Sequence, residues 1–70
     1  MTTLDSAMKE KIATFRAKLL EYKEDYGCTY QELEEICEVS SANIGNFIRE
    51  KNGLYGTSLI KISLATGIPL

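Results

Sequence analysis

The spacing of apolar residues predicts a long helix at the start of the chain. Apolar side chains recur there at steps of four and three, which is the spacing of one helix face. They are Met8, Ile12, Phe15, Leu19, Tyr22 and Tyr26. We expect one helix over residues 6–25, with Asp5 capping its start and Gly27 ending it. The same spacing fits a heptad seam, so packing on its own domain and pairing with another helix are both open.

A capping box marks the start of a second helix. Thr29–Glu32 reads T-Y-Q-E, in which the Thr hydroxyl and the Glu carboxylate each accept a backbone amide, and this predicts a helix over 30–37. New cap residues at 39–41 then predict a third helix over 41–51. The apolar side chains expected to lock the two helices together are Leu33, Ile36, Val39, Ile44 and Phe47.

The last part of the chain predicts a fourth helix. Thr57 or Ser58 is expected to cap a helix over 58–66, and Gly67 is expected to end it. No stretch alternates as a strand does. We therefore expect an all-α, four-helix domain with a long first helix, one domain over residues 1–70.

Two short helices joined by a turn of three or four residues form a helix-turn-helix. In such a pair the second helix can enter the major groove of DNA, which is about 12 Å wide. The central stretch reads T-Y-Q-E-L-E-E-I-C-E-V-S-S-A-N-I-G-N-F-I-R, with L-L-E-Y-K-E-D-Y-G-C-T before it and S-L-I-K-I-S-L-A-T-G-I after it. It resembles the Cro/phage-repressor (XRE-like) helix-turn-helix family. The resemblance implies a lambda-repressor-like fold and a small phage or prophage repressor that binds double-stranded DNA, with its third helix in the major groove.

The resemblance also implies which side chains contact DNA. Those expected at base edges are Ser41, Ala42, Asn43 and Asn46. Those expected at phosphates are Tyr30, Gln31, Arg49 and Lys51. An asparagine can pair bidentately with adenine, which favours the two asparagines as readers of sequence. The alternative is that Ser41 and both asparagines are only a helix cap and a solvated face.

Two residues depart from the family pattern. Glu38 stands where the family usually has glycine before the turn, and Glu34 stands where a small residue usually packs between the helices. A carboxylate there is costly to bury unless it is paired or reaches water. We expect either an altered angle between the helices or a cationic partner for Glu34, such as Arg49 or Lys51.

The charge distribution favours a second hypothesis. The net charge is −2, but residues 21–38 hold one lysine and seven carboxylates, a net charge of −6. These negatively charged side chains repel the phosphates of DNA. The alternative is therefore a protein-binding module of the same fold: an antirepressor, a modulator of a repressor, or an inhibitor whose acidic second helix docks on a basic regulatory partner. A cluster within this stretch also suits a hard cation, a mimic of the phosphate backbone, or simply a solvated face; its members are Glu32, Glu34, Glu35 and Glu38.

Apolar residues on both sides of the fourth helix indicate a second burial surface. One apolar stripe is formed by Leu59, Ile62 and Ala65. The apolar side chains on the other side, Ile60 and Leu64, suggest contact with a partner. A homodimer built on Ile60, Leu64 and Leu70 is one possibility. The other is packing beneath the long first helix.

Composition argues against other classes of function. The chain has no histidine and two distant cysteines, so we expect no metal site. It has no paired nucleophile and base and no glycine-rich phosphate loop, so we expect no enzyme and no cofactor. No run approaches the ~20 apolar residues of a membrane span, and the charged first residues do not fit a signal peptide. We expect a cytoplasmic protein without a membrane partner.

Overall fold

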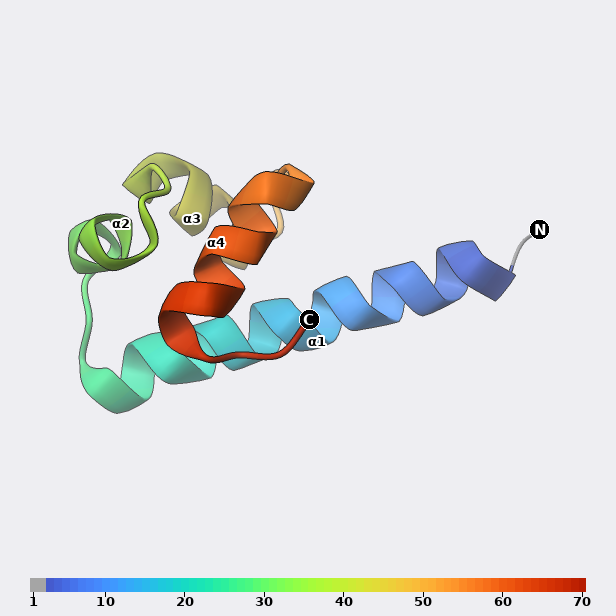
Figure 1. Ribbon diagram of the computed structural model, residues 1–70, viewed down its shortest axis with the longest axis horizontal. Coiled ribbons are helices and arrows are strands. Elements are labelled where there is room, and N and C mark those ends of the chain that lie inside the picture. Colours follow the sequence, from blue (N-terminus) through green and yellow to red (C-terminus); the bar gives the residue numbers. More distant parts are fainter. Residues whose placement is uncertain (1–2) are drawn as a thin grey trace.

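The computed structural model describes residues 3–70, which form four helices joined by short connections. The helices are α1 (Thr3–Tyr26), α2 (Tyr30–Cys37), α3 (Ser41–Ile48) and α4 (Gly56–Thr66), as Figure 1 shows. Residues 3–70 contain no strand. The all-α, four-helix fold with a long first helix is confirmed, and α2, its three-residue turn and α3 form the helix-turn-helix.

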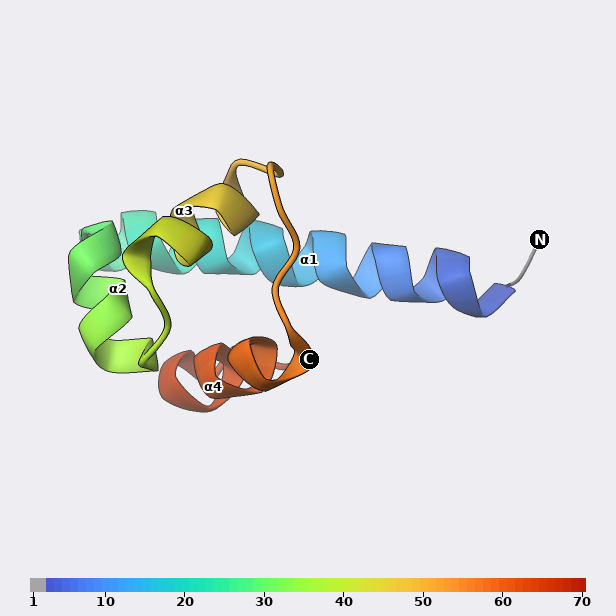
Figure 2. The same cartoon turned by 90° about the horizontal axis from the view of Figure 1, so that it is seen from above.

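Helix α1 is longer than each of the other three described helices. It crosses one side of the other three helices, and its N-terminal part extends beyond them (Figures 1 and 2). Its C-terminal part buries Phe15 and Leu19, whereas Met8 on the same face is 58% exposed. The predicted apolar stripe therefore packs on the domain over only part of its length. The helix already includes Thr3, so the expectation that Asp5 caps its start is wrong.

The core lies where α1, α3 and α4 meet α2. Its buried members are Phe15, Leu19, Leu33, Cys37, Val39, Ile44, Phe47, Ile48, Ile62 and Ile68. The rings of Phe15 and Phe47, 6.3 Å apart between centroids, join α1 to α3. Arg16 reinforces this contact, because its Nε donates to the Phe47 carbonyl oxygen at 2.8 Å and its guanidinium lies 4.7 Å from the Phe47 ring centroid. Helix α1 thus supplies a cation near the C-terminal end of α3, where carbonyl oxygens lack helical partners.

The ends of α2 follow from local chemistry. The predicted capping box is present: Glu32 N–H donates to Thr29 Oγ1 at 3.1 Å, and Thr29 N–H donates to Glu32 Oε1 at 2.8 Å. At the other end Glu38 has φ 57° and ψ 38°, and its N–H donates to the Glu34 carbonyl oxygen. That left-handed conformation is the one that glycine adopts without steric cost.

Helix α3 is shorter than predicted. It ends at Ile48 rather than at residue 51, because Glu50 turns to φ 61°. The N–H groups of Glu50 and Lys51 then donate to the carbonyl oxygens of Phe47 and Asn46, which is a Schellman motif. Polar residues can continue or end a helix, so their pattern alone did not indicate this stop.

Helix α4 begins two residues earlier than predicted, at Gly56 rather than at residue 58. Tyr55 occupies the N-cap position, and no side chain caps the helix there, so the expected cap by Thr57 or Ser58 is wrong. Gly67 ends the helix as predicted, with φ 78° and its N–H donating to the Ser63 carbonyl oxygen.

Candidate nucleic-acid interface

The outer face of α3 carries small and polar side chains. Ala42 and Asn43 are exposed, and Ser41 and Asn46 are half-buried. The apolar side of the helix lies in the core through Ile44, Phe47 and Ile48. All four side chains predicted to meet bases therefore reach the surface to some extent.

The two asparagines have different surroundings. Asn43 borders a hollow formed with the loop that follows α3, lined also by Asn52, Leu54 and Tyr55. Asn46 is held by its own helix, because its Oδ1 accepts a hydrogen bond of 3.2 Å from Nη2 of Arg49. One amide is thus beside a loop and the other is already oriented by a cation.

Two of the predicted phosphate contacts lie together. The Arg49 guanidinium carbon is 5.7 Å from the centroid of the Tyr30 ring, so the start of α2 meets the end of α3. Gln31 and Lys51 are exposed and lie outside this contact. The structure thus brings together Tyr30 and Arg49 of the four predicted phosphate contacts.

A second cation, which the sequence analysis did not single out, joins this group. Lys23, near the end of α1, places its Nζ 4.7 Å from the centroid of the same Tyr30 ring. Cation–ring attraction at exposed sites contributes roughly 0.5–1 kcal/mol. We call Lys23, Tyr30, Asn46 and Arg49 the cationic cluster. Nothing local in the sequence around Lys23 signals this contact, because the residues come from three helices.

Gly45 is also part of the arrangement. A Cβ atom at this position would lie 3.2 Å from Nη1 and 3.3 Å from Nη2 of Arg49. Glycine in a helix interior costs roughly 0.5–1 kcal/mol relative to alanine, so a glycine there often marks a close approach. In α3 the close approach is that of the Arg49 guanidinium.

The Glu34 carboxylate caps α3 instead of lying buried between the helices. Glu34 is exposed, and its Oε1 accepts a hydrogen bond of 2.6 Å from the N–H of Ser41. Ser40, at the N-cap position, makes no side-chain cap bond, so Glu34 takes that role. The expected cationic partner, Arg49 or Lys51, is therefore wrong. A carboxylate is favourable at a helix N-terminus, where unpaired N–H groups carry partial positive charge.

Charge consequently changes sign along α3. Its N-terminal end lies beside Glu34, and the preceding turn contains Glu38, whereas its C-terminal end lies beside Arg16 and Arg49. A polyanion that approaches α3 is repelled at the first end and attracted at the second.

The acidic side of α2 also carries exposed apolar surface. Ile36 was expected to lock α2 to α3, but it is 44% exposed. The other four residues of that predicted set are buried. Ile36 lines a groove with Glu38 of the turn and with Lys61 and Leu64 of α4.

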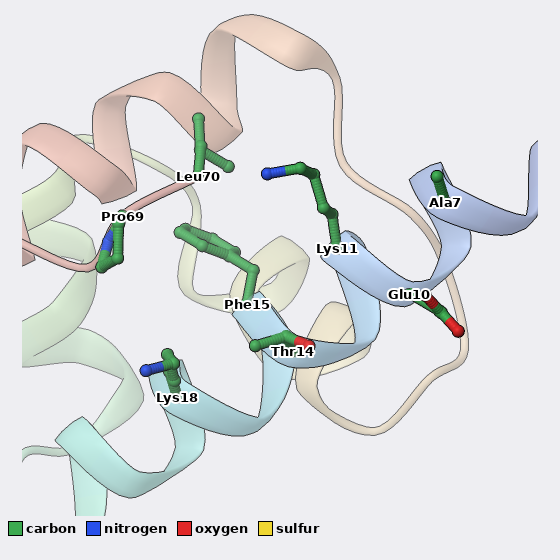
Figure 3. A pocket seen from close by; sticks show the side chains of 8 residues that line it. All are labelled: Ala7, Glu10, Lys11, Thr14, Phe15, Lys18, Pro69 and Leu70. Atoms are coloured by element: carbon green, nitrogen blue, oxygen red, sulfur yellow. The ribbon is translucent and has the colours of Figure 1, made fainter. Parts of the chain in front are cut away.

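The predicted dimer residues are exposed, but they belong to two surfaces. Ile60 and Leu64, 51% and 81% exposed, lie one turn apart on α4. Leu70 instead lines a hollow beside α1, with Lys11 and Phe15 (Figure 3). Ile60 and Leu64 are thus not packed beneath α1, and dimerisation through these residues stays a prediction.

Other chemistry is sparse in the part of the chain that the structure describes. Within residues 3–70, no three side chains of histidine, cysteine, aspartate or glutamate gather as metal ligands would. Cys28 and Cys37 are both free thiols, and burial raises the pKa of the Cys37 thiol, with a smaller contribution from Cys28. None of the four described helices has the length and hydropathy of a membrane span.

Comparisons of the chain with protein-family models, with curated proteins and with solved structures find no match.

Proposed function

We propose that this chain is a sequence-specific DNA-binding transcriptional regulator that places α3 in the major groove. One observation carries the proposal: the small, polar outer face of α3 lies beside a cation that is already folded against it. Asn46 belongs to that face, and Arg49 is bonded to Asn46 and packed on Tyr30. Phosphate contacts orient a protein on DNA, and contacts to base edges supply specificity. The phage-repressor kind of regulator rests on the sequence resemblance alone.

The charge gradient along α3 favours one orientation on the duplex. Lys23, Tyr30 and Arg49 face the phosphate backbone, because phosphates contribute most of the affinity of such proteins. The end of α3 beside Glu34 stays away from phosphates, and its exposed Ala42 and Asn43 face the base edges. Non-specific affinity is modest in this arrangement, since few cations meet the backbone.

The proposal is tested by selecting sequences from a randomised duplex library and measuring affinities by fluorescence anisotropy. Asn43→Ala and Asn46→Ala should each reduce the preference for the selected sequence over random duplex by about 5- to 150-fold, the range for one bidentate base contact. Asn52→Ala makes the same chemical change in the loop and should leave the preference unchanged. Failure to enrich any sequence would reject specificity. The absence of binding even at concentrations on the order of 100 μM, the weak end of non-specific affinity, would reject DNA binding.

A second candidate function is docking on a basic protein through α2. The observation that favours it is the groove in which Ile36 and Leu64 lie exposed beside Glu38, with Glu35 also exposed on α2. Its apolar floor fits the apolar anchors of an amphipathic helix, and Glu35 and Glu38 on the α2 side fit lysines of that helix, while Lys61 lines the groove from α4.

Charge reversal separates the two candidates. Glu35→Lys and Glu38→Lys should strengthen binding to random duplex and weaken binding to a labelled leucine–lysine helical peptide. Unchanged peptide affinity in both variants would reject docking at this groove. Sedimentation of the unmodified chain shows whether a second copy occupies the surface instead, and a dimer lost in Leu64→Glu would identify it.

A further inference from the structure

We infer that Lys23, Tyr30 and Arg49 form one preassembled clamp for a single backbone phosphate, and that Gly45 is the residue that gives Arg49 its place in it. The inference rests on the proposed DNA binding and adds to it a residue of α1. Its ligand class is the phosphodiester of duplex DNA.

The clamp draws on three helices. Lys23 lies in the last turn of α1, Tyr30 begins α2, and Arg49 caps the end of α3. The two cations lie 4.7 Å and 5.7 Å from the centroid of one ring. An aromatic ring attracts a cation over its face, so both cations are held at this one ring before any ligand arrives. A phosphate within reach of both cations would be attracted by each of them.

Arg49 keeps donors available for that phosphate. One of its five N–H groups donates to Asn46, and within residues 3–70 the others donate to no protein acceptor. Glu34, one turn along α2 from Tyr30, is bonded to neither cation; its carboxylate instead accepts the N–H of Ser41 at the start of α3. Two positive charges therefore lie over one ring, and within residues 3–70 no carboxylate is bonded to either of them.

Preassembly changes what binding requires. A lysine or arginine that moves freely loses rotamer freedom when it grips a phosphate. Here Tyr30 and Asn46 already restrict Arg49, and Tyr30 restricts Lys23. Part of the ordering has thus taken place on folding, and the clamp holds the phosphate in a defined position relative to α3.

Gly45 explains how Arg49 can lie so close to its own helix. A methyl group there would lie 3.2–3.3 Å from both terminal nitrogens of the guanidinium, which is tighter than ordinary packing. Gly45→Ala should therefore shift the guanidinium by a few tenths of an ångström and disturb its contacts with Asn46 and Tyr30. Because alanine favours a helix more than glycine does, the same change should raise the Tm, by up to about 4–8 °C for a domain of this size. Stability and DNA affinity are thus expected to move in opposite directions.

The experiment measures affinity for a random-sequence duplex as a function of salt. The variants are Lys23→Met, Arg49→Met, their double variant and Gly45→Ala. Their matched controls are Lys61→Met, an exposed lysine of α4, and Gly53→Ala, a loop glycine with nothing near its Cβ position. Thermal unfolding of each variant shows that it is folded.

Each neutralised phosphate contributes about 0.9 to the slope of log affinity against log salt. If the two cations hold one phosphate, the double variant should lose no more than about 0.9 of slope in total. Its affinity loss should also be smaller than the product of the two single losses. Gly45→Ala should weaken binding while its Tm rises, and both controls should bind as the unmodified chain does.

Two results would overturn the clamp and leave the proposed function standing. Additive effects, with about 1.8 of slope lost in the double variant, would mean two separate phosphate contacts. Unchanged affinity in Lys23→Met or in Gly45→Ala would remove that residue from the arrangement. If the unmodified chain binds no duplex at all, both the proposed function and the clamp fail.

Discussion

Replacing Glu38 with glycine should stabilise this domain, although it removes a whole side chain. Glu38 has φ 57° and ψ 38°, a left-handed conformation that costs a residue with a Cβ atom roughly 1–2 kcal/mol. The side chain is exposed, so its removal costs little packing. Glycine has more freedom in the unfolded chain, which offsets about 0.4–1 kcal/mol of the gain. The expected net stabilisation is about 0.5–1 kcal/mol, a rise in Tm of several degrees.

The assay is thermal and urea unfolding of three variants compared with the unmodified chain. Glu38→Ala removes the charge but keeps a Cβ atom, so it isolates the electrostatic part of the effect. Glu35→Gly makes the same exchange inside α2 and should destabilise by about 1 kcal/mol, because glycine is a poor helix former. Equal stability of Glu38→Gly and Glu38→Ala would refute the reasoning, since the left-handed backbone would then carry no cost. Glu50→Gly, at φ 61°, tests the same principle at the end of α3.

Three other changes test the fold that supports the candidate interface. Glu34→Ala should lower the free energy of unfolding, measured in urea, by about 1 kcal/mol, because it removes the acceptor that caps the N–H of Ser41. Glu34→Gln keeps an acceptor and should lower it less. Equal losses in the two variants would contradict the cap. Phe47→Ala should lower the free energy of unfolding by about 3–5 kcal/mol, because the ring is fully buried between α1 and α3. Circular dichroism should then show a largely unfolded chain. A folded variant with an unchanged Tm would contradict the role of this ring in joining the helices. Because the pKa of the Cys37 thiol is raised in the folded state, the unfolded chain loses this proton at a lower pH than the folded chain does. The free energy of unfolding should therefore decrease as pH rises above about 8.5. Urea titrations at several pH values should show this decrease, and a smaller one in Cys37→Ala.

Much of the candidate site could not be predicted from the amino-acid sequence. Tyr30 and Arg49 were expected at phosphates, but from a family resemblance and as separate contacts. Lys23 and Gly45 were not expected there, because their roles depend on where three helix ends meet. Gly45 did leave a signal, a glycine inside a helix, but the signal does not say which atom approaches it.

The sequence by itself determined those features in which the interacting residues lie within a few positions of each other. The capping box of Thr29 and Glu32 spans three residues, and the stop at Gly67 depends on the conformation of one. Most of the core was also predictable, since burial follows helical periodicity.

The tertiary structure decided the rest, because the angle and offset between helices are set by the packing of all of them together. It placed the Glu34 carboxylate on the N-terminus of α3 and left Ile36 half-exposed. It also gathered Lys23 and Arg49 around one ring. Local patterns say which face of a helix is apolar, but not which side chains of other helices that face will meet.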